Sequence, residues 1–131
     1  MFRSAVIGCG AVSKNHGKAL KDNRYTTLEY CVDIEYEKAV AFSEKYGGVP
    51  LSDYRELFDK NIDVAHVVTP HNTHPLIVMD LLSHGINVFC EKPLAQTAEE
   101  CQQIIAAEQA AGKKLVQVGF MRRYDRGYMA M

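Results

Sequence analysis

Short apolar runs rich in β-branched residues alternate along this chain with longer segments whose apolar residues recur every three or four positions. Runs of the first kind are typical of buried strands, and segments of the second kind are typical of helices that cover a sheet. This alternation predicts an α/β fold of the Rossmann type, a doubly wound parallel sheet with helices on both faces. The six expected strands are 2–8, 28–33, one near Val49, 64–69, 87–90 and 114–119. The five expected helices are 12–22, 36–46, 54–59, 75–84 and 98–111.

The residues at the expected helix boundaries agree with this pattern. Thr97 and Glu100 form a capping box before the last helix, and Pro75 suits the first turn of the helix that it begins. Glycines stand where three helices should stop, namely Gly47, Gly85 and Gly112. Local and global signals therefore predict the same fold.

The run GCGAVS, residues 8–13, lies between the first strand and the first helix. Gly8 permits a tight turn there, and Gly10 lets the backbone approach a diphosphate that a side chain would block. The diphosphate would lie at the N-terminus of the helix that begins near Val12, where free N–H groups and the helix dipole favour negative charge. Ser13 stands where a third glycine is common, so we expect slightly looser packing of helix on strand.

Asp33 ends the second strand about 20 residues beyond Ser13, the spacing of a carboxylate that binds the adenosine ribose of a dinucleotide. A carboxylate there repels a 2′-phosphate, and the next residue, Ile34, supplies no positive charge to offset that repulsion. The sequence therefore predicts NAD as the cofactor, in preference to NADP. The alternative is that the glycines only make a tight loop and that Asp33 only caps the next helix.

Two polar clusters follow later strands: TPHNTH at 69–74 and EKP at 91–93. Ligands of open α/β sheets bind at the carboxyl ends of strands, so both clusters should face one crevice. Hydrogen bonds near the nicotinamide half of the cofactor would come from Thr69, Asn72 and His74. For His71 and His74 the alternative is a solvated loop with helix capping, and no further ligand is spaced to complete a zinc site.

Lys92 is the candidate catalytic residue, because it emerges from an apolar strand between Glu91 and Pro93. Partial desolvation and a neighbouring cationic nicotinamide would both lower the pKa of its amine. The amine would then bind or deprotonate a substrate hydroxyl. The alternative is a surface lysine paired with Glu91, and a cis Lys92–Pro93 bond is left open.

Composition narrows the classes of partner. The chain has 15 Lys and Arg against 16 Asp and Glu, so no overall charge attracts nucleic acid or an anionic membrane surface. The four cysteines are far apart and form no CxxC pair, which favours buried thiols in a reducing, cytoplasmic setting. No apolar run reaches the ~18 residues that a membrane span requires. Any partner would be recognised locally.

Four features in this order, GCGAVSKNH, Asp33, TPHNTH and EKP, resemble the N-terminal domain of the Gfo/Idh/MocA oxidoreductase family. The stretch VGFMRRYD, 118–125, is most similar to the inositol dehydrogenases of that family. The resemblance covers essentially the whole chain. Each motif is modest when taken singly, but their combination is specific.

The resemblance implies a Rossmann domain for NAD or NADP and a second α+β domain that holds a sugar or polyol, with hydride passing from a secondary alcohol carbon to the cofactor. It also implies a homo-oligomer for the full-length protein. By resemblance the cofactor contacts are Gly8, Gly10, Ala11, Val12, Asp33, Thr69, Asn72, His74 and Glu91. Lys92 would contact the reacting hydroxyl and Arg122 the polyol, although Arg122 also fits a solvated basic tail.

Family members carry an aspartate and a histidine in the second domain, where the histidine usually accepts the proton. The present chain ends at Met131, so we expect it to be a fragment. Residues 1–121 would form the dinucleotide-binding domain, and 122–131 would begin the connection to a substrate domain. The alternatives are a stand-alone dinucleotide-binding or interaction module without catalysis, and a family member that acts on another sugar or a dihydrodiol.

Overall fold

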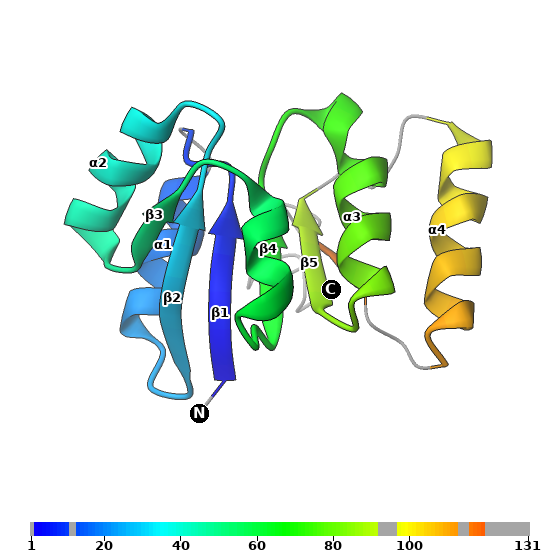
Figure 1. The fold of residues 1–131 in the computed structure, drawn as a ribbon, viewed down its shortest axis with the longest axis horizontal. Helices are drawn as coiled ribbons and strands as arrows, with labels where there is room; N and C mark the ends of the chain where they lie inside the picture. The colour runs from blue at the N-terminus through cyan, green and yellow to red at the C-terminus, as the bar shows by residue number, and fades with distance from the viewer. Residues whose placement is uncertain (1, 11–12, 92–96, 113–115, 120–131) are drawn as a thin grey trace, which may run out of the picture.

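The computed structural model describes residues 2–10, 13–91, 97–112 and 116–119, which form one parallel sheet with helices on both faces (Figure 1). The strands are β1 (Phe2–Ile7), β2 (Thr26–Val32), β3 (Val49–Leu51), β4 (Val64–Val67), β5 (Asn87–Glu91) and β6 (Val116–Gly119). They lie in the order β3-β2-β1-β4-β5-β6, and every neighbouring pair is parallel. The predicted doubly wound sheet is confirmed. Its strand order reverses between β1 and β4, which is where ligands bind in such folds.

Helical elements connect these strands. They are α1 (Ser13–Asp22), α2 (Tyr36–Tyr46), η1 (Tyr54–Asp59), η2 (His71–Thr73), α3 (His74–Ser83) and α4 (Ala98–Ala110). The helix expected at 54–59 is a 3₁₀-helix, as short connectors often are. The segment η2 was not predicted, because its three residues have no periodicity to recognise. The start of the first predicted helix, near Val12, lies outside the described residues.

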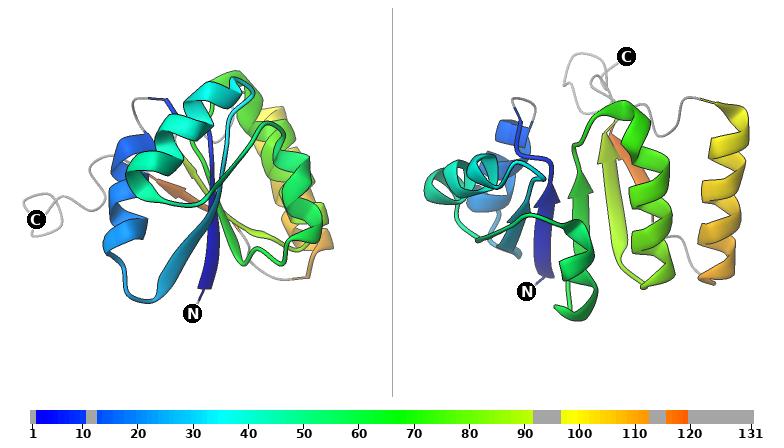
Figure 2. Two further views of the ribbon diagram at one scale, coloured as in Figure 1. Left: turned by 60° about the vertical axis from the view of Figure 1, so that its left-hand side comes forward. Right: turned by 45° about the horizontal axis from the view of Figure 1, so that its top comes forward.

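Alternate residues of each strand point to opposite faces of the sheet and into two separate cores. Ala5 and Ile7 of β1 belong to the larger core, which η1, α3 and α4 cover. Val6 between them belongs to the smaller core, which α1 and α2 cover. Figure 2 shows the two helical layers on either side of the strands. Side chains such as Leu57 and Leu81 are fully buried, and burial of each contributes about 1.5–3 kcal/mol.

The predicted boundary residues act as expected. The Thr97 hydroxyl accepts a hydrogen bond from the Glu100 N–H at 3.1 Å, and Pro75 occupies the first turn of α3. Three glycines beyond helix ends have positive φ: Gly47 (99°), Gly85 (73°) and Gly112 (79°). In each case glycine avoids the steric cost that a side chain would bring to that conformation.

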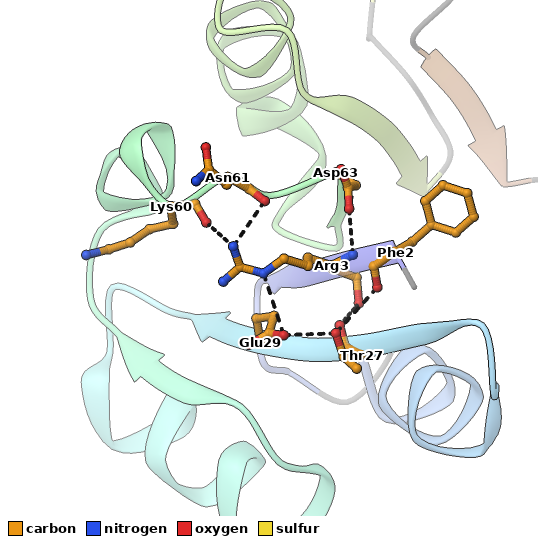
Figure 3. Close-up of polar contacts among 8 residues, drawn as sticks. Phe2, Arg3, Thr27, Glu29, Lys60, Asn61 and Asp63 are labelled. Carbon is orange, nitrogen blue, oxygen red and sulfur yellow. Dashed lines mark hydrogen bonds and ion pairs between the residues drawn. The ribbon is translucent and has the colours of Figure 1, made fainter.

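At the amino ends of the strands, Arg3 joins segments that are distant in the sequence (Figure 3). Its N–H donates to the Asp63 carboxylate at 2.8 Å, and its guanidinium donates to the Lys60 carbonyl at 2.9 Å. The guanidinium also lies 3.6 Å from the Glu29 carboxylate of β2. One residue of β1 thereby holds both β2 and the turn before β4, at the end of the sheet opposite the predicted crevice.

None of the four cysteines, all of which lie in the described residues, forms a disulfide, and Cys31 and Cys90 are buried. The longest described helix, α4, has 13 residues. Within the part of the chain that the structure describes, no helix has the length and apolar character needed to cross a membrane.

Candidate functional site

Gly8 directly follows β1 and lies against the backbone that follows β4. Its φ is +99°, and its N–H donates to the Val32 carbonyl of β2 at 2.7 Å. A Cβ at this position would lie 2.6 Å from the Val68 carbonyl oxygen and 2.9 Å from the Thr69 nitrogen. Glycine is therefore required twice, by backbone conformation and by close approach of another backbone segment. The sequence predicted the turn but not its contact with the loop after β4.

Gly10 is exposed, and a Cβ placed on it would meet no heavy atom within 4 Å. This position therefore borders open space on the outer side of the turn, as a residue approached by a diphosphate should. Ala11 and Val12, the next predicted contacts, lie outside the described residues.

Ser13 occupies the position of the third glycine of the motif, whereas Gly17 permits a close contact between α1 and α2. Ser13 is fully buried, and its hydroxyl donates to the Gly10 carbonyl within the turn. The close approach occurs one helical turn later, where a Cβ on Gly17 would lie 2.7 Å from the Tyr46 ring and 2.8 Å from Phe42. Sequence reasoning missed Gly17, although an isolated glycine inside a helix costs about 1 kcal/mol and usually has a packing reason.

Asp33 lies immediately beside the glycine turn. Its Oδ2 accepts a hydrogen bond from the Cys9 N–H at 3.0 Å, and its Oδ1 accepts one from the Glu35 N–H at 2.8 Å. The carboxylate thus links the turn to Glu35, the N-cap residue of α2, but Asp33 is not itself the cap of that helix. Each oxygen retains a lone pair for a ribose hydroxyl. The neighbouring side chain, Ile34, is 91% exposed and uncharged.

The loop after β4 holds itself together around Thr69. The carbonyl of Thr69 lies 2.8 Å from Nε2 of His74, which must carry the proton because a carbonyl oxygen only accepts. His74 is fully buried, so in this structure its ring faces the loop backbone and not solvent. Thr73 lies 2.6 Å from the Thr69 hydroxyl, and Asn72 is exposed. Of the three predicted contacts here, Thr69 and Asn72 are accessible to a ligand.

The remaining predicted residues lie at or beyond β5. The backbone of Glu91 ends β5 opposite Gly119 of β6, at the carboxyl edge that also carries the glycine turn. Lys92 and Arg122 lie outside the described residues, as does the Lys92–Pro93 bond. Cofactor, catalytic and substrate contacts of these residues remain predictions.

A contact between the buried His16 and the half-buried His66 was not found from the sequence. Nδ1 of His16 on α1 lies 2.9 Å from Nδ1 of His66 on β4, and the His66 ring stacks on Phe89. Burial, with a smaller contribution from His16, lowers the pKa of His66 to about 4. His66 is therefore neutral near pH 7, and the pair attaches α1, the helix behind the glycine turn, to β4.

The thiol of Cys9 is also part of the turn. Its contact with the Cys31 thiol, followed by burial, raises the pKa of Cys9 above its ordinary range. A protonated thiol is a poor nucleophile. The side chain therefore packs beneath the turn, while the Cys9 backbone N–H holds Asp33.

Together these residues form an edge suited to an extended anionic ligand. The glycine turn offers open space, Asp33 offers carboxylate oxygens on the β2 side, and Thr69 offers a hydroxyl on the β4 side. Among the residues that the structure describes, no three His, Cys, Asp or Glu side chains gather in a metal-binding group.

Comparison with known proteins gives consistent matches. The family profile described as "Oxidoreductase family, NAD-binding Rossmann fold" (Gfo/Idh/MocA) matches residues 2–120. An inositol 2-dehydrogenase of Salmonella paratyphi B is 37% identical over 99% of this chain and 40% of its own length. One from Burkholderia cenocepacia is 41% identical over 96% of this chain and 39% of its own length.

A solved structure extends the likeness to three dimensions. The crystal structure of myo-inositol dehydrogenase from Lactobacillus casei, in complex with NAD(H) and myo-inositol, matches with a TM-score of 0.92. The two sequences are 33% identical. The match covers 99% of the present chain and 40% of the Lactobacillus casei chain. The present chain therefore spans about two fifths of the length of these relatives.

Proposed function

This chain belongs to the Gfo/Idh/MocA oxidoreductase family and matches the NAD-binding Rossmann domain of that family. We propose that it is the cofactor-binding part of a dehydrogenase that oxidises a polyol such as myo-inositol. Such an enzyme converts a secondary alcohol to a ketone. The observation that carries the cofactor half of this proposal is the Asp33 carboxylate, bonded to the glycine turn through the Cys9 N–H. The substrate half is supported by the inositol 2-dehydrogenases, at 37% and 41% identity, that the chain resembles.

The preference for NAD over NADP follows from charge. A 2′-phosphate on the adenosine ribose would place its negative charge beside the Asp33 carboxylate. Like charges in such contact cost several kcal/mol. The exposed neighbour Ile34 has no charge to compensate. Ribose hydroxyls, by contrast, can donate to the free lone pairs of the carboxylate.

NAD, when bound, accepts the hydride from the alcohol carbon. We assign the cofactor contacts to Gly8, Gly10, Ala11, Val12, Asp33, Thr69, Asn72 and Glu91, with His74 beneath Thr69. Lys92 would hold the reacting hydroxyl, since it directly follows Glu91 at the carboxyl edge of the sheet. Arg122 would bind the polyol. Residues 1–121 would bind the cofactor, and 122–131 would lead toward the substrate domain.

We also propose a cytoplasmic location, because none of the four cysteines forms a disulfide in the described structure. The longer protein would be a homo-oligomer, as the family resemblance implies.

Calorimetric titration of the chain with NAD and NADP tests the cofactor assignment. We expect NAD to bind at least tenfold more tightly, a difference of about 1.4 kcal/mol or more. Asp33→Asn should remove the charge repulsion and narrow the difference. Asp59→Asn, at a carboxylate whose side chain is 84% exposed on η1, is the control and should leave it unchanged. Absence of NAD binding, or tighter binding of NADP by the unmodified chain, would refute the assignment.

Turnover of the longer protein tests the substrate assignment. Oxidation of myo-inositol should be measurable with NAD, and Lys92→Ala should lower kcat more than it changes KM, because the amine contacts the reacting hydroxyl. Full activity of the alanine variant would remove Lys92 from the mechanism.

A further inference from the structure

A hydrogen bond between two histidine rings joins α1 to the middle of the sheet. Nδ1 of His16 lies 2.9 Å from Nδ1 of His66, so one nitrogen donates a proton and the other accepts it. Burial lowers the pKa of His66 to about 4, so at pH 7 its neutral ring has one nitrogen that donates and one that accepts. His16 is buried, which limits competition by water. The two rings therefore form a specific bond between a helix and a strand.

His66 is the fixed member of this pair. It lies on β4, between β1 and β5, where it is in register with Val6 on one side and Phe89 on the other. Its ring stacks on the Phe89 ring, with centroids 5.2 Å apart and 27° between the planes. The Phe89 ring also lies 5.6 Å from the His16 ring, in an edge-on arrangement. A side chain held in this way has little freedom to move, so its bond restrains His16.

His16 completes the first turn of α1. It is the fourth residue of a helix that begins at Ser13, and its Cα lies about 4.5 Å along the axis from that start. The later part of α1 is held by other contacts, with Leu20 in the smaller core and Gly17 close to α2. The histidine pair thus fixes the first turn of the helix relative to β4.

This first turn is where the diphosphate of the cofactor would lie. The first four N–H groups of an α-helix have no partner within the helix, and together they can bind an anion that they point toward. A small tilt of the helix would change all of these directions at once. The glycine turn is also held by β4, because Gly8 packs against the backbone that follows this strand. β4 is therefore a common support for the turn and, through His66, for the helix.

We propose that His66 is a positioning residue for the cofactor: through its bond to His16, it holds the first turn of α1 in the orientation that binds the diphosphate. This role rests on the proposed function and deepens it. His66 acts only through His16 and contacts neither the diphosphate nor the reacting atoms.

Two substitutions of His66 in the 131-residue chain test this role. His66→Phe keeps an aromatic ring for the stack on Phe89 but removes the hydrogen bond. We expect NAD affinity, measured by calorimetry, to fall about tenfold in this variant, the effect of one hydrogen bond. His66→Asn places an amide group at the position of Nδ1 and can restore the bond, so its affinity should stay within about threefold of the unmodified chain.

A control variant separates positioning from a general loss of stability. Ile104→Val removes a buried methyl group on α4, in the larger core, and should lower the free energy of unfolding in urea without changing NAD affinity. At saturating NAD, the ³¹P resonances of the bound diphosphate should move toward those of free NAD in His66→Phe. They should keep their positions in Ile104→Val.

The same bond can be removed from the helix. His16→Phe should lower NAD affinity at least as much as His66→Phe, and it provides the test if His66→Phe does not fold. In a chain that already carries His16→Phe, adding His66→Phe should cause little further loss, because the bond between the two rings is already absent.

Five results would overturn the proposed role of His66: unchanged NAD affinity in His66→Phe or in His16→Phe, an equal loss in His66→Asn, an equal loss in Ile104→Val, additive losses in the double variant, or unmoved ³¹P resonances in His66→Phe. Failure of the unmodified chain to bind NAD would instead refute the proposed function, and the role of His66 would fall with it.

Discussion

Alanine substitutions at Gly8 and Gly10 should show which glycine the fold requires and which one the diphosphate requires. Gly8→Ala tests the requirement of the fold. The φ of +99° disfavours any residue with a Cβ, at a cost of about 1–2 kcal/mol. The new Cβ would also lie 2.6 Å from the Val68 carbonyl oxygen, closer than real Cβ atoms approach backbone. Relief of such overlap typically costs a further 1–3 kcal/mol or so, because backbone must move. The free energy of unfolding should therefore fall by about 2–5 kcal/mol.

Gly10→Ala is the matched control, because it makes the same substitution in the same turn. A Cβ at Gly10 meets no heavy atom within 4 Å, so stability should change by no more than about 0.5 kcal/mol. The same methyl group would occupy the space of the diphosphate, and NAD affinity should fall sharply. Urea unfolding measures the first effect and calorimetry the second. A Gly8→Ala variant as stable as the unmodified chain, or a Gly10→Ala variant destabilised as much as Gly8→Ala, would contradict the different roles of these two glycines.

Three further predictions concern packing and charge. Gly17→Ala should lower the midpoint of thermal unfolding, because the new Cβ would lie 2.7 Å from the Tyr46 ring. Alanine has the better helix propensity, so a raised midpoint would contradict the close contact of α1 with α2. Arg3→Met keeps much of the side-chain volume but removes the guanidinium contacts, so the free energy of unfolding in urea should fall by about 1–3 kcal/mol. Arg24→Met is the control: the arginine has an exposed contact with its neighbour Tyr25, and its loss should lower the free energy of unfolding by less than about 0.5 kcal/mol. The pKa of His66 falls from 6.5 to about 4 on folding, so the unfolded chain binds more protons between these values. Stability should then rise by about 3 kcal/mol from pH 4 to pH 7, and His66→Phe should flatten this part of the profile; an unchanged profile would exclude His66 as its cause.

The fold could be predicted from the sequence because its signals are local. The alternation of apolar runs with helical segments, the glycines beyond helix ends and the capping threonine at Thr97 each act within a few residues. A parallel sheet with right-handed crossovers leaves few topologies for such an order of elements. The helix predicted at 54–59 is confirmed as η1 with the same bounds, and its 3₁₀ type is new information, because over six residues periodicity barely distinguishes α from 3₁₀.

The candidate site was predictable in its outline and not in its contacts. Gly8, Gly10 and Asp33 were found because spacing along a strand–turn–helix unit limits where they lie. His74 was predicted to contact the cofactor, whereas the structure buries its ring against the Thr69 carbonyl. Spacing alone does not say whether a side chain at a helix start turns inward or outward.

By itself, the sequence determined the order of strands and helices, the position of the glycine turn and the carboxylate that directly follows β2. Only the tertiary structure decided what surrounds them: Val68 against Gly8, Tyr46 against Gly17, and His66 against His16, 50 residues away along the chain. The reason is physical. Backbone preferences depend on neighbouring residues, but close packing and buried hydrogen bonds depend on which distant segments the fold brings within a few ångströms.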